Sequence, residues 1–253
     1  MAPIPESYPV KNGDVYISFI VSDGDAWHFA TGDMLNFWSN SVRGQQAIGW
    51  TIPSAFAKYN PLMLEYYCDT ATEKDNLLQG PSGISYIYPC KTPADAYQTY
   101  LLETKDIFEQ TGVNLVNVWD WVNTNNSMVG ENEALLHQYI DVVQPDAVFR
   151  GHDSLTGGYT VYNGTVLIEE MGNMDGRGAM NSEDILQAID FVRSQTSSSA
   201  PTFVVINVEA WGDCVNAITP ALEALAERSD AASYHVVTPA ELIAAIQTYE
   251  NIP

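Results

Sequence analysis

The chain has 253 residues, of which 32 are acidic and only 10 are Lys or Arg, so its formal net charge is −22. An acidic surface of this kind disfavours nucleic acids and anionic membranes as partners, because both are polyanions. Only 17% of the residues are charged, which argues against a disordered acidic tail, and no apolar run is long enough to cross a bilayer.

The length fits one α/β barrel, so we expect a single domain over residues 1–253 with an N-terminal extension at 1–13. The opening MAPIPESYP has neither the basic region nor the apolar core of a signal peptide. The acidic composition nevertheless fits a secreted or periplasmic protein that has lost a leader. Its three cysteines, Cys68, Cys90 and Cys214, show no CxxC spacing, so a Cys68–Cys90 disulfide and three free thiols are both open.

Strands and helices alternate through most of the chain. The apolar and β-branched runs predict eight strands, at 14–25, 47–53, 83–89, 114–121, 146–153, 165–170, 202–211 and 233–239. Apolar residues at spacings of three and four predict helices at 96–112, 132–145, 181–195, 219–229 and 238–250. The interval 26–80 is less regular, and we expect a helix within 28–40 and helix and loop, without a strand, over 53–71.

This alternation implies a parallel sheet. Eight strands in a chain of this length favour a (β/α) barrel of seven to eight mostly parallel strands, similar to a TIM barrel and allowing some distortion. Thr219 and Thr238 are expected helix N-caps, the second with Glu241 as a capping box. Most predicted strands begin apolar and end on a carboxylate, His, Trp or Tyr, and in such barrels these ends share one rim, where the chemistry occurs.

The first strand ends in a Ser-Asp-Gly-Asp sequence. Asp23 and Asp25 are two residues apart, so on an extended chain they face the same way, and Gly24 permits a sharp turn. Such a pair can bind a cation or act as an acid and a base. The alternative is a turn in which the aspartates cap the next segment.

The fourth strand ends with Asp120 between Trp119 and Trp121. Indole rings stack on the apolar faces of sugars while a carboxylate acts on an oxygen, so this sequence suits a sugar site. The alternative is that both tryptophans pack in the core and that Asp120 only begins a loop.

Three polar residues, Arg150, His152 and Asp153, follow the fifth strand. Arg150 and Asp153 could form a structural ion pair, and His152 could bind a metal, act as a base or donate a hydrogen bond. A single His without an HxH or HxxxH pattern is more often not a metal ligand.

The sixth and seventh strands also end on polar side chains. Glu169 and Glu170 are adjacent, so at most one of them faces the barrel axis. Asn207, Glu209 and Trp211 alternate and share one face, a combination typical of sugar sites. The alternative is that Glu209 only bonds to a neighbouring loop.

The segment GPSGISYIYP at 80–89 resembles the signature of the GxGYxYP family of glycoside hydrolases. The stretches VSDGD, FRGHD, NVEAWGD and YHVVTPAELIAAI agree, so the resemblance covers residues 14–249 and matches the family's C-terminal, catalytic-type domain. It implies an α/β barrel and a carbohydrate substrate. Ser85 stands where the signature has its second glycine, and Ala26 stands where Asn is expected.

The leading hypothesis is therefore carbohydrate hydrolysis by two rim carboxylates, one of Asp23 and Asp25 with one of Asp120 and Glu209, without a required cofactor. The aromatic platform would consist of Trp27, Tyr86, Tyr88, Trp119, Trp121 and Trp211. Further substrate-binding candidates are Arg150, His152, Asp153 and Asn207.

Two other functions stay open. The aspartate pair is similar to the first motif of polysaccharide deacetylases, so Asp23, Asp25 and His152 could hold a divalent metal, although the paired-His motif of those enzymes is absent from the sequence. A non-catalytic carbohydrate-binding module on a barrel fold is the third hypothesis.

Overall fold

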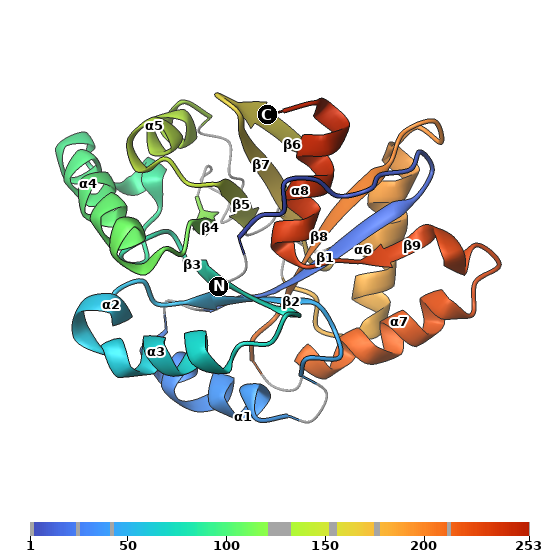
Figure 1. The fold of residues 1–253 in the computed structure, drawn as a ribbon, viewed down its shortest axis with the longest axis horizontal. Helices are drawn as coiled ribbons and strands as arrows, with labels where there is room; N and C mark the ends of the chain where they lie inside the picture. The colour runs from blue at the N-terminus through green and yellow to red at the C-terminus, as the bar shows by residue number, and fades with distance from the viewer. Residues whose placement is uncertain are drawn as a thin grey trace.

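The computed structural model describes residues 3–23, 26–40, 43–120, 133–151, 156–174, 178–211 and 214–252. Seven parallel strands close into a barrel, and helices surround it (Figure 1). Around the barrel the strands follow the order β1 (Val15–Val21), β2 (Ile48–Ile52), β3 (Asp75–Gln79), β4 (Leu115–Trp119), β5 (Ala147–Gly151), β7 (Thr165–Met171) and β8 (Thr202–Val208). β8 then pairs with β1 and closes the barrel.

Two short strands are added to this barrel. β6 (Tyr159–Tyr162) pairs antiparallel with β7, and β9 (Tyr234–Val236) pairs parallel with the first residues of β1. β2 pairs with the last residues of β1 on the same edge, so β1 changes its partner near its middle. The expected barrel of seven to eight mostly parallel strands is confirmed.

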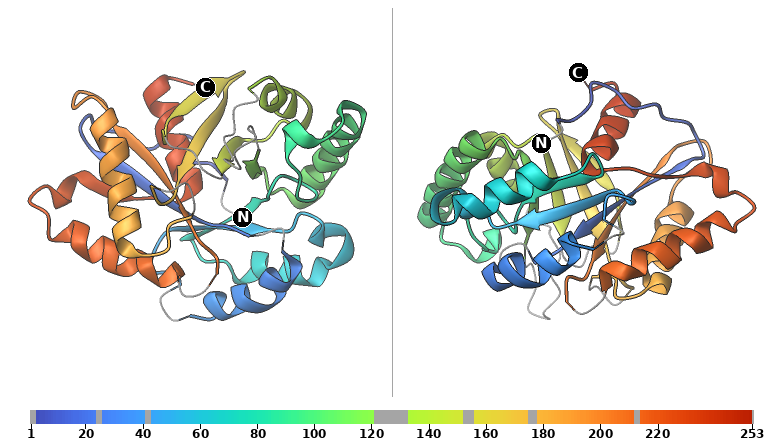
Figure 2. Two further views of the ribbon diagram at one scale, coloured as in Figure 1. Left: turned by 180° about the vertical axis from the view of Figure 1, so that it is seen from behind. Right: turned by 60° about the horizontal axis from the view of Figure 1, so that its bottom comes forward.

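The helices from residue 94 onward lie where the 3.6-residue periodicity predicts them, and the two views in Figure 2 show the helices around the strands. They are α1 (Met34–Trp38), α2 (Phe56–Tyr59), α3 (Pro61–Thr70), α4 (Ala94–Thr111), α5 (Glu133–Val143), α6 (Ser182–Gln195), α7 (Ile218–Ala226) and α8 (Pro239–Glu250). Short 3₁₀ or π turns are η1 (Phe29–Asp33), η2 (Pro89–Lys91), η3 (Cys214–Ala217) and η4 (Ala231–Ser233). Thr238 and Glu241 form the expected capping box, but Thr219 lies inside α7, whose N-cap is Ala217.

The strand predicted at 83–89 is wrong, because this segment is an irregular loop. Its alternating apolar residues imitate a strand, yet side chains take its backbone groups: the Thr104 hydroxyl accepts a hydrogen bond from the Ile84 N–H, and the Tyr100 hydroxyl donates to the Ser85 carbonyl. Gly83 has φ +150°, and a Cβ there would lie 2.7 Å from Thr104. Local packing therefore overrides the strand pattern.

The third barrel strand is β3 instead, in a segment where no strand was expected. All five of its residues are buried, including Asp75 at its start and Gln79 at its end. Asp75 accepts hydrogen bonds from Arg43 (2.6 Å) and Trp50 (2.9 Å), and Gln79 donates to Thr111 (2.8 Å). These distant partners make polar residues acceptable in a buried strand.

Side chains alternate between the helices and the inside of the barrel. The inward-facing residues near the amino ends of the strands are mostly apolar and form one cluster with α8, which closes that end of the barrel. The Ala240 N–H at the start of α8 donates to the Asn76 side chain (2.8 Å), and Pro239 lies against Gly49, where a Cβ would come within 2.7 Å of its ring. The amino end is therefore filled, and the opposite end remains to carry a site.

The structure has no disulfide between Cys68 and Cys90, so that alternative is not realised there. Among the described residues, none of the helices has both the length and the apolar character needed to span a bilayer.

Candidate functional site

A buried layer of polar side chains lies inside the barrel at the carboxyl ends of the strands, which we call the mouth. Glu170 comes from β7, Asn117 from β4 and Asn207 from β8; they are 1%, 0% and 4% exposed. The Glu170 carboxylate accepts a hydrogen bond on one oxygen from Asn117 Nδ2 (2.7 Å) and on the other from Asn207 Nδ2 (2.7 Å). A carboxylate is thus held between two amides at the centre of the mouth.

The wall beside Glu170 is formed by Gly151, the last residue of β5. A Cβ on Gly151 would lie 2.4 Å from Glu170 Oε2 and 2.3 Å from Trp119 Nε1. Only glycine therefore allows the carboxylate and the indole to approach this strand so closely. Trp119 was predicted to bind substrate, and it does face the mouth.

The loops after β1 and β8 place two predicted carboxylates at the strand ends. Asp23 has φ +67°, in the left-handed region, and its carbonyl accepts a hydrogen bond from the Ala26 N–H (3.0 Å), so the chain turns sharply there. Glu209 follows β8, is half-buried, and its N–H donates to the Ala179 carbonyl (3.0 Å). Because β1 and β8 are neighbours, both acids lie at one side of the mouth.

Exposed aromatic rings follow the same two strands. Trp27 is 40% exposed and packs edge-on against Phe56, with 4.9 Å between ring centroids. Trp211 is 41% exposed and stacks on His28 at 5.2 Å. Flat, accessible indoles of this kind can stack on an apolar ring face of a ligand.

A second aromatic group comes from the loop after β3. The rings of Tyr86 and Tyr88 are 5.1 Å apart, their hydroxyls are hydrogen-bonded to each other, and Tyr86 packs edge-on against Trp119 at 5.7 Å. The Ser82 side chain accepts from the Trp119 N–H (3.0 Å), and the Tyr139 hydroxyl donates to the Ser82 carbonyl (2.7 Å). These bonds fasten the loop to β4 and α5.

Burial keeps the loop's tyrosine anchors protonated. It is the main cause that raises the pKa of Tyr100 and of Tyr139 well above the usual Tyr value. Both hydroxyls therefore remain donors to the loop in alkaline solution. Ser85, which replaces the second glycine of the signature sequence, is absent from the described residues with positive φ, so its position does not require glycine.

Two predicted site residues turn away from the mouth. Asp120 is buried, and its Oδ1 accepts from the Cys90 N–H (2.9 Å), which holds η2 against β4. Arg150 alternates with the inward-facing Gly151 and pairs with Glu169 (3.5 Å), while its predicted partner Asp153 lies outside the described residues. The geometry favours structural roles for both.

Four predicted site residues lie outside the described part of the chain: Asp25, Trp121, His152 and Asp153. The described ranges contain no group of three His, Cys, Asp or Glu side chains placed to hold a metal. The proposed ligands Asp25 and His152 are not in those ranges.

Glu170 is not among the site residues that the sequence predicts. The sequence indicated that at most one of Glu169 and Glu170 faces the axis, and this alternation was the available signal. It did not say which one, because Val166, Leu167 and Ile168 before them are all apolar and buried. Such a strand does not reveal which residues face inward and which face outward.

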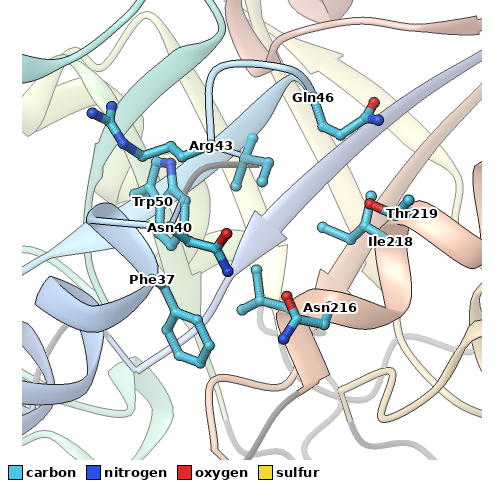
Figure 3. Close-up of a pocket in the computed structure, with 10 residues that line it drawn as sticks. Phe37, Asn40, Arg43, Gln46, Trp50, Asn216, Ile218 and Thr219 are labelled. Atoms are coloured by element: carbon cyan, nitrogen blue, oxygen red, sulfur yellow. The ribbon is translucent and has the colours of Figure 1, made fainter.

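A separate small hollow lies outside the barrel, between α1 and η3–α7. Figure 3 shows Phe37, Asn40 and Trp50 on one side of it and Asn216 and Ile218 on the other. None of its lining residues is acidic, and its one cation, Arg43, is already bonded to Asp75 (2.6 Å). It offers no carboxylate for hydrolysis, unlike the mouth.

A family model described as "GxGYxYP putative glycoside hydrolase C-terminal domain" matches residues 13–247. The chain belongs to this GxGYxYP family. The matched range includes the loop that carries Tyr86 and Tyr88, whose sequence resembles the family's signature and whose Tyr86 packs against Trp119 at the mouth. No curated protein sequence matches the chain.

Solved structures support the barrel fold of this GxGYxYP domain. A crystal structure described as a "putative hydrolase" from Bacteroides thetaiotaomicron is similar with a TM-score of 0.78 at 21% identity, over 98% of this chain and 48% of the other. The chain thus spans about half the length of that protein. A "probable Polysaccharide deacetylase" from Pseudomonas aeruginosa PAO1 has a TM-score of 0.57 at 12% identity, over 91% of this chain and 90% of the other. A "putative polysaccharide deacetylase" from Mycobacterium smegmatis has a TM-score of 0.51 at 12% identity, over 99% and 94%.

Proposed function

We propose that this GxGYxYP domain hydrolyses glycosidic bonds of an oligo- or polysaccharide at the mouth of its barrel. The observation that carries the proposal is the buried Glu170 carboxylate at the mouth, with further carboxylates and exposed aromatic rings on the loops of neighbouring strands. Two carboxylates at a site lined by aromatic rings are the usual apparatus of glycoside hydrolysis. Membership of a family described as glycoside hydrolases supports the same substrate class.

The ring contacts fit a sugar because a pyranose has an apolar face and a polar edge. Trp27 and Trp211 expose indole faces on one side of the mouth, and Tyr86 exposes its ring on the loop after β3. Stacking would orient the sugar, while its hydroxyls meet the polar layer below. In this arrangement the glycosidic oxygen would lie near the strand ends.

The chemistry needs one acid and one ionised carboxylate. The acid protonates the leaving oxygen, and the ionised group either attacks the anomeric carbon or takes a proton from water. Asp23, Asp25 and Glu209 are the candidates for the acid. Asp120 is not retained, because its carboxylate is bonded to the backbone of η2.

This reading requires no cofactor and no nucleic-acid or membrane partner. A polysaccharide substrate, together with the acidic surface, fits a secreted or periplasmic enzyme. Cell fractionation with an antibody to the native protein would test that location.

A metal-dependent deacetylase-like hydrolase is the second candidate. It is favoured by the similarity in fold to the two structures named as polysaccharide deacetylases. Asp23, Asp25 and His152 would hold the ion, which would activate water. Metal content of the protein purified without chelator, and acetate release from acetylated polysaccharides, would test it.

The main experiment screens plant, bacterial and fungal polysaccharides for release of reducing ends. We expect the native protein to hydrolyse a substrate. The two test variants are the double variant Asp23→Asn/Asp25→Asn and the single variant Glu209→Gln, and the one that removes the acid should lose about 10²-fold or more of the activity. Glu223→Gln, on the exposed face of α7, is the control and should keep full activity. Full activity in both test variants would refute the assignment of the acid. Sugar binding by calorimetry without any turnover would favour a carbohydrate-binding module instead.

A further inference from the structure

The hydrogen bonds of Glu170 reveal which protonation state the mouth accommodates. Both of its oxygens accept from a side-chain amide at 2.7 Å, and all three side chains are almost fully buried. An ionised carboxylate only accepts hydrogen bonds, whereas the protonated acid must turn an O–H donor toward one of its neighbours. Two donors on the two oxygens therefore suit the ionised form.

The orientation of the Asn117 amide is fixed by a further contact. Its Nδ2 also points at the Phe149 carbonyl oxygen (3.4 Å), which can only accept a hydrogen bond. Turning the amide around would set its oxygen against this carbonyl and against Glu170. The donor role of Asn117 thus follows from its surroundings.

The other ends of the two amides are unsatisfied. Among the described residues no donor reaches Asn117 Oδ1 or Asn207 Oδ1, although both atoms are buried. Buried acceptors normally have a partner, so these two oxygens are placed to receive donors from a bound molecule. A sugar hydroxyl or a reacting water would supply them.

We propose that Glu170 is the catalytic carboxylate that reacts in its ionised form, and that Asn117 and Asn207, the amide clamp, position it. This inference rests on the proposed function and assigns the second carboxylate of that reaction. The acid must then be a different group, with Asp23, Asp25 and Glu209 as the candidates.

Two balanced reactions are open to an ionised Glu170. In the first, a Glu170 oxygen bonds to the anomeric carbon as the glycosidic C–O bond breaks, and the leaving oxygen takes the proton of the acid. In the second step the deprotonated acid takes a proton from water, the water oxygen attacks the anomeric carbon, and the bond to Glu170 breaks. In the second, Glu170 takes a proton from water while the water oxygen attacks, and the acid protonates the leaving oxygen.

The neighbouring Glu169 provides a matched control. It lies on the same strand but faces outward, paired with Arg150 at 3.5 Å. We expect Glu170→Gln to lower kcat about 10³-fold or more on the substrate found by the screen, and Glu169→Gln to change it less than about threefold. Equal activity of the two variants would overturn the catalytic role of Glu170.

The pH profile tests the amide clamp. Removing one amide donor in Asn117→Ala or Asn207→Ala should disfavour the ionised carboxylate, so the acidic limb of kcat/KM should move to higher pH by about one unit. A merely structural role would lower kcat/KM without moving this limb. An unmoved limb in both variants would overturn the clamp.

Azide rescue separates the base or nucleophile from the acid. In Glu170→Ala, azide should restore turnover of an activated aryl glycoside and give a glycosyl azide whose anomeric configuration is inverted relative to the substrate. A product of retained configuration would assign Glu170 as the acid and overturn the proposal.

The failure of this inference can be told from the failure of the proposed function. With ¹³C-labelled glutamate, the Glu170 signal, assigned by its loss in Glu170→Gln, should titrate at higher pH in Asn117→Ala than in the native protein. If the native protein cleaves no glycoside, the proposed function and the catalytic role fall together, while this titration still decides the clamp. If glycosides are cleaved but the titration and the pH limb stay in place, only the clamp falls.

Discussion

The two halves of the barrel interior differ although the same strands build both. On β4, β7 and β8 the inward-facing residue changes from apolar to polar within two positions, in the pairs Leu115 and Asn117, Ile168 and Glu170, Val205 and Asn207. The deep half buries apolar surface and so stabilises the fold. The mouth half buries a carboxylate, which costs free energy even when hydrogen-bonded. A costly layer at the strand ends is therefore best explained by chemistry.

The largest expected effect on stability lies in the deep half. Phe149 is fully buried and lies on β5 two residues before Gly151. It belongs to the apolar cluster that includes α8. Phe149→Ala should lower the free energy of unfolding by about 3–5 kcal/mol, because it leaves a cavity that the barrel cannot collapse around. Urea denaturation followed by fluorescence measures this. A loss below about 1 kcal/mol would mean that the deep layer is not the stabilising one.

Gly151→Ala tests the point where the two halves meet. The added Cβ would lie 2.3 Å from Trp119 Nε1 and 2.4 Å from Glu170 Oε2, so one of them must move. We expect a stability loss of about 1–3 kcal/mol from overpacking and, in addition, a loss of most activity because the carboxylate is displaced.

Gly158→Ala is the control for that experiment, because the nearest atom to its Cβ would be 3.9 Å away. It should leave activity and unfolding nearly unchanged. If Gly151→Ala behaves like this control, the close approach of Glu170 and Trp119 to β5 is not required.

Glu170→Gln separates stability from activity in the mouth half. Neutralising a buried carboxylate relieves its desolvation cost, while one amide contact becomes unfavourable. We expect the free energy of unfolding to stay level or rise by about 1 kcal/mol while activity is lost. A fall of more than about 2 kcal/mol would instead place Glu170 among the residues that hold the barrel together.

Sequence periodicity predicted the barrel because each helix and most strands satisfy their own pattern locally. It failed where partners are distant in the chain. β3 carries Asp75 and Gln79, which look unsuited to a buried strand until Arg43 and Thr111 bond to them. The loop at 83–89 looks like a strand until Thr104 and Tyr100 take its backbone groups.

The positions of the candidate site residues could be predicted only in part, for the same reason. The rim position of Asp23, Glu209 and the tryptophans follows from their place after parallel strands. The direction of Asp120 and Arg150 does not, because it depends on Cys90 and Glu169 in other elements. The inward direction of Glu170 could not be predicted, because the strand before it is apolar on both faces. Its sequence therefore does not show which of its last residues face the barrel axis.

The smallest expected effect on stability comes from a hydrogen bond as short as those of Glu170 but in more exposed surroundings. Arg193 and Asp230 are 2.7 Å apart, as are Glu170 and its amide donors, but the Arg193–Asp230 pair is partly exposed to solvent. The hydrogen bond from Arg193 is the main cause that lowers the pKa of Asp230. Its stabilisation is therefore present above the usual Asp value of about 3.9 and is lost as the pH falls through the lowered value.

Asp230→Asn should accordingly lower the midpoint of thermal unfolding slightly at pH 6, and the difference should shrink toward pH 2 as the native carboxyl takes up a proton. Added salt should also reduce the difference, because solvent and ions screen a partly exposed pair. Calorimetry of both proteins at these two pH values decides the matter. A difference at pH 6 as large as that for Phe149→Ala would show that burial does not set the strength of these contacts. The contrast between the mouth and the deep half would then lose its physical basis.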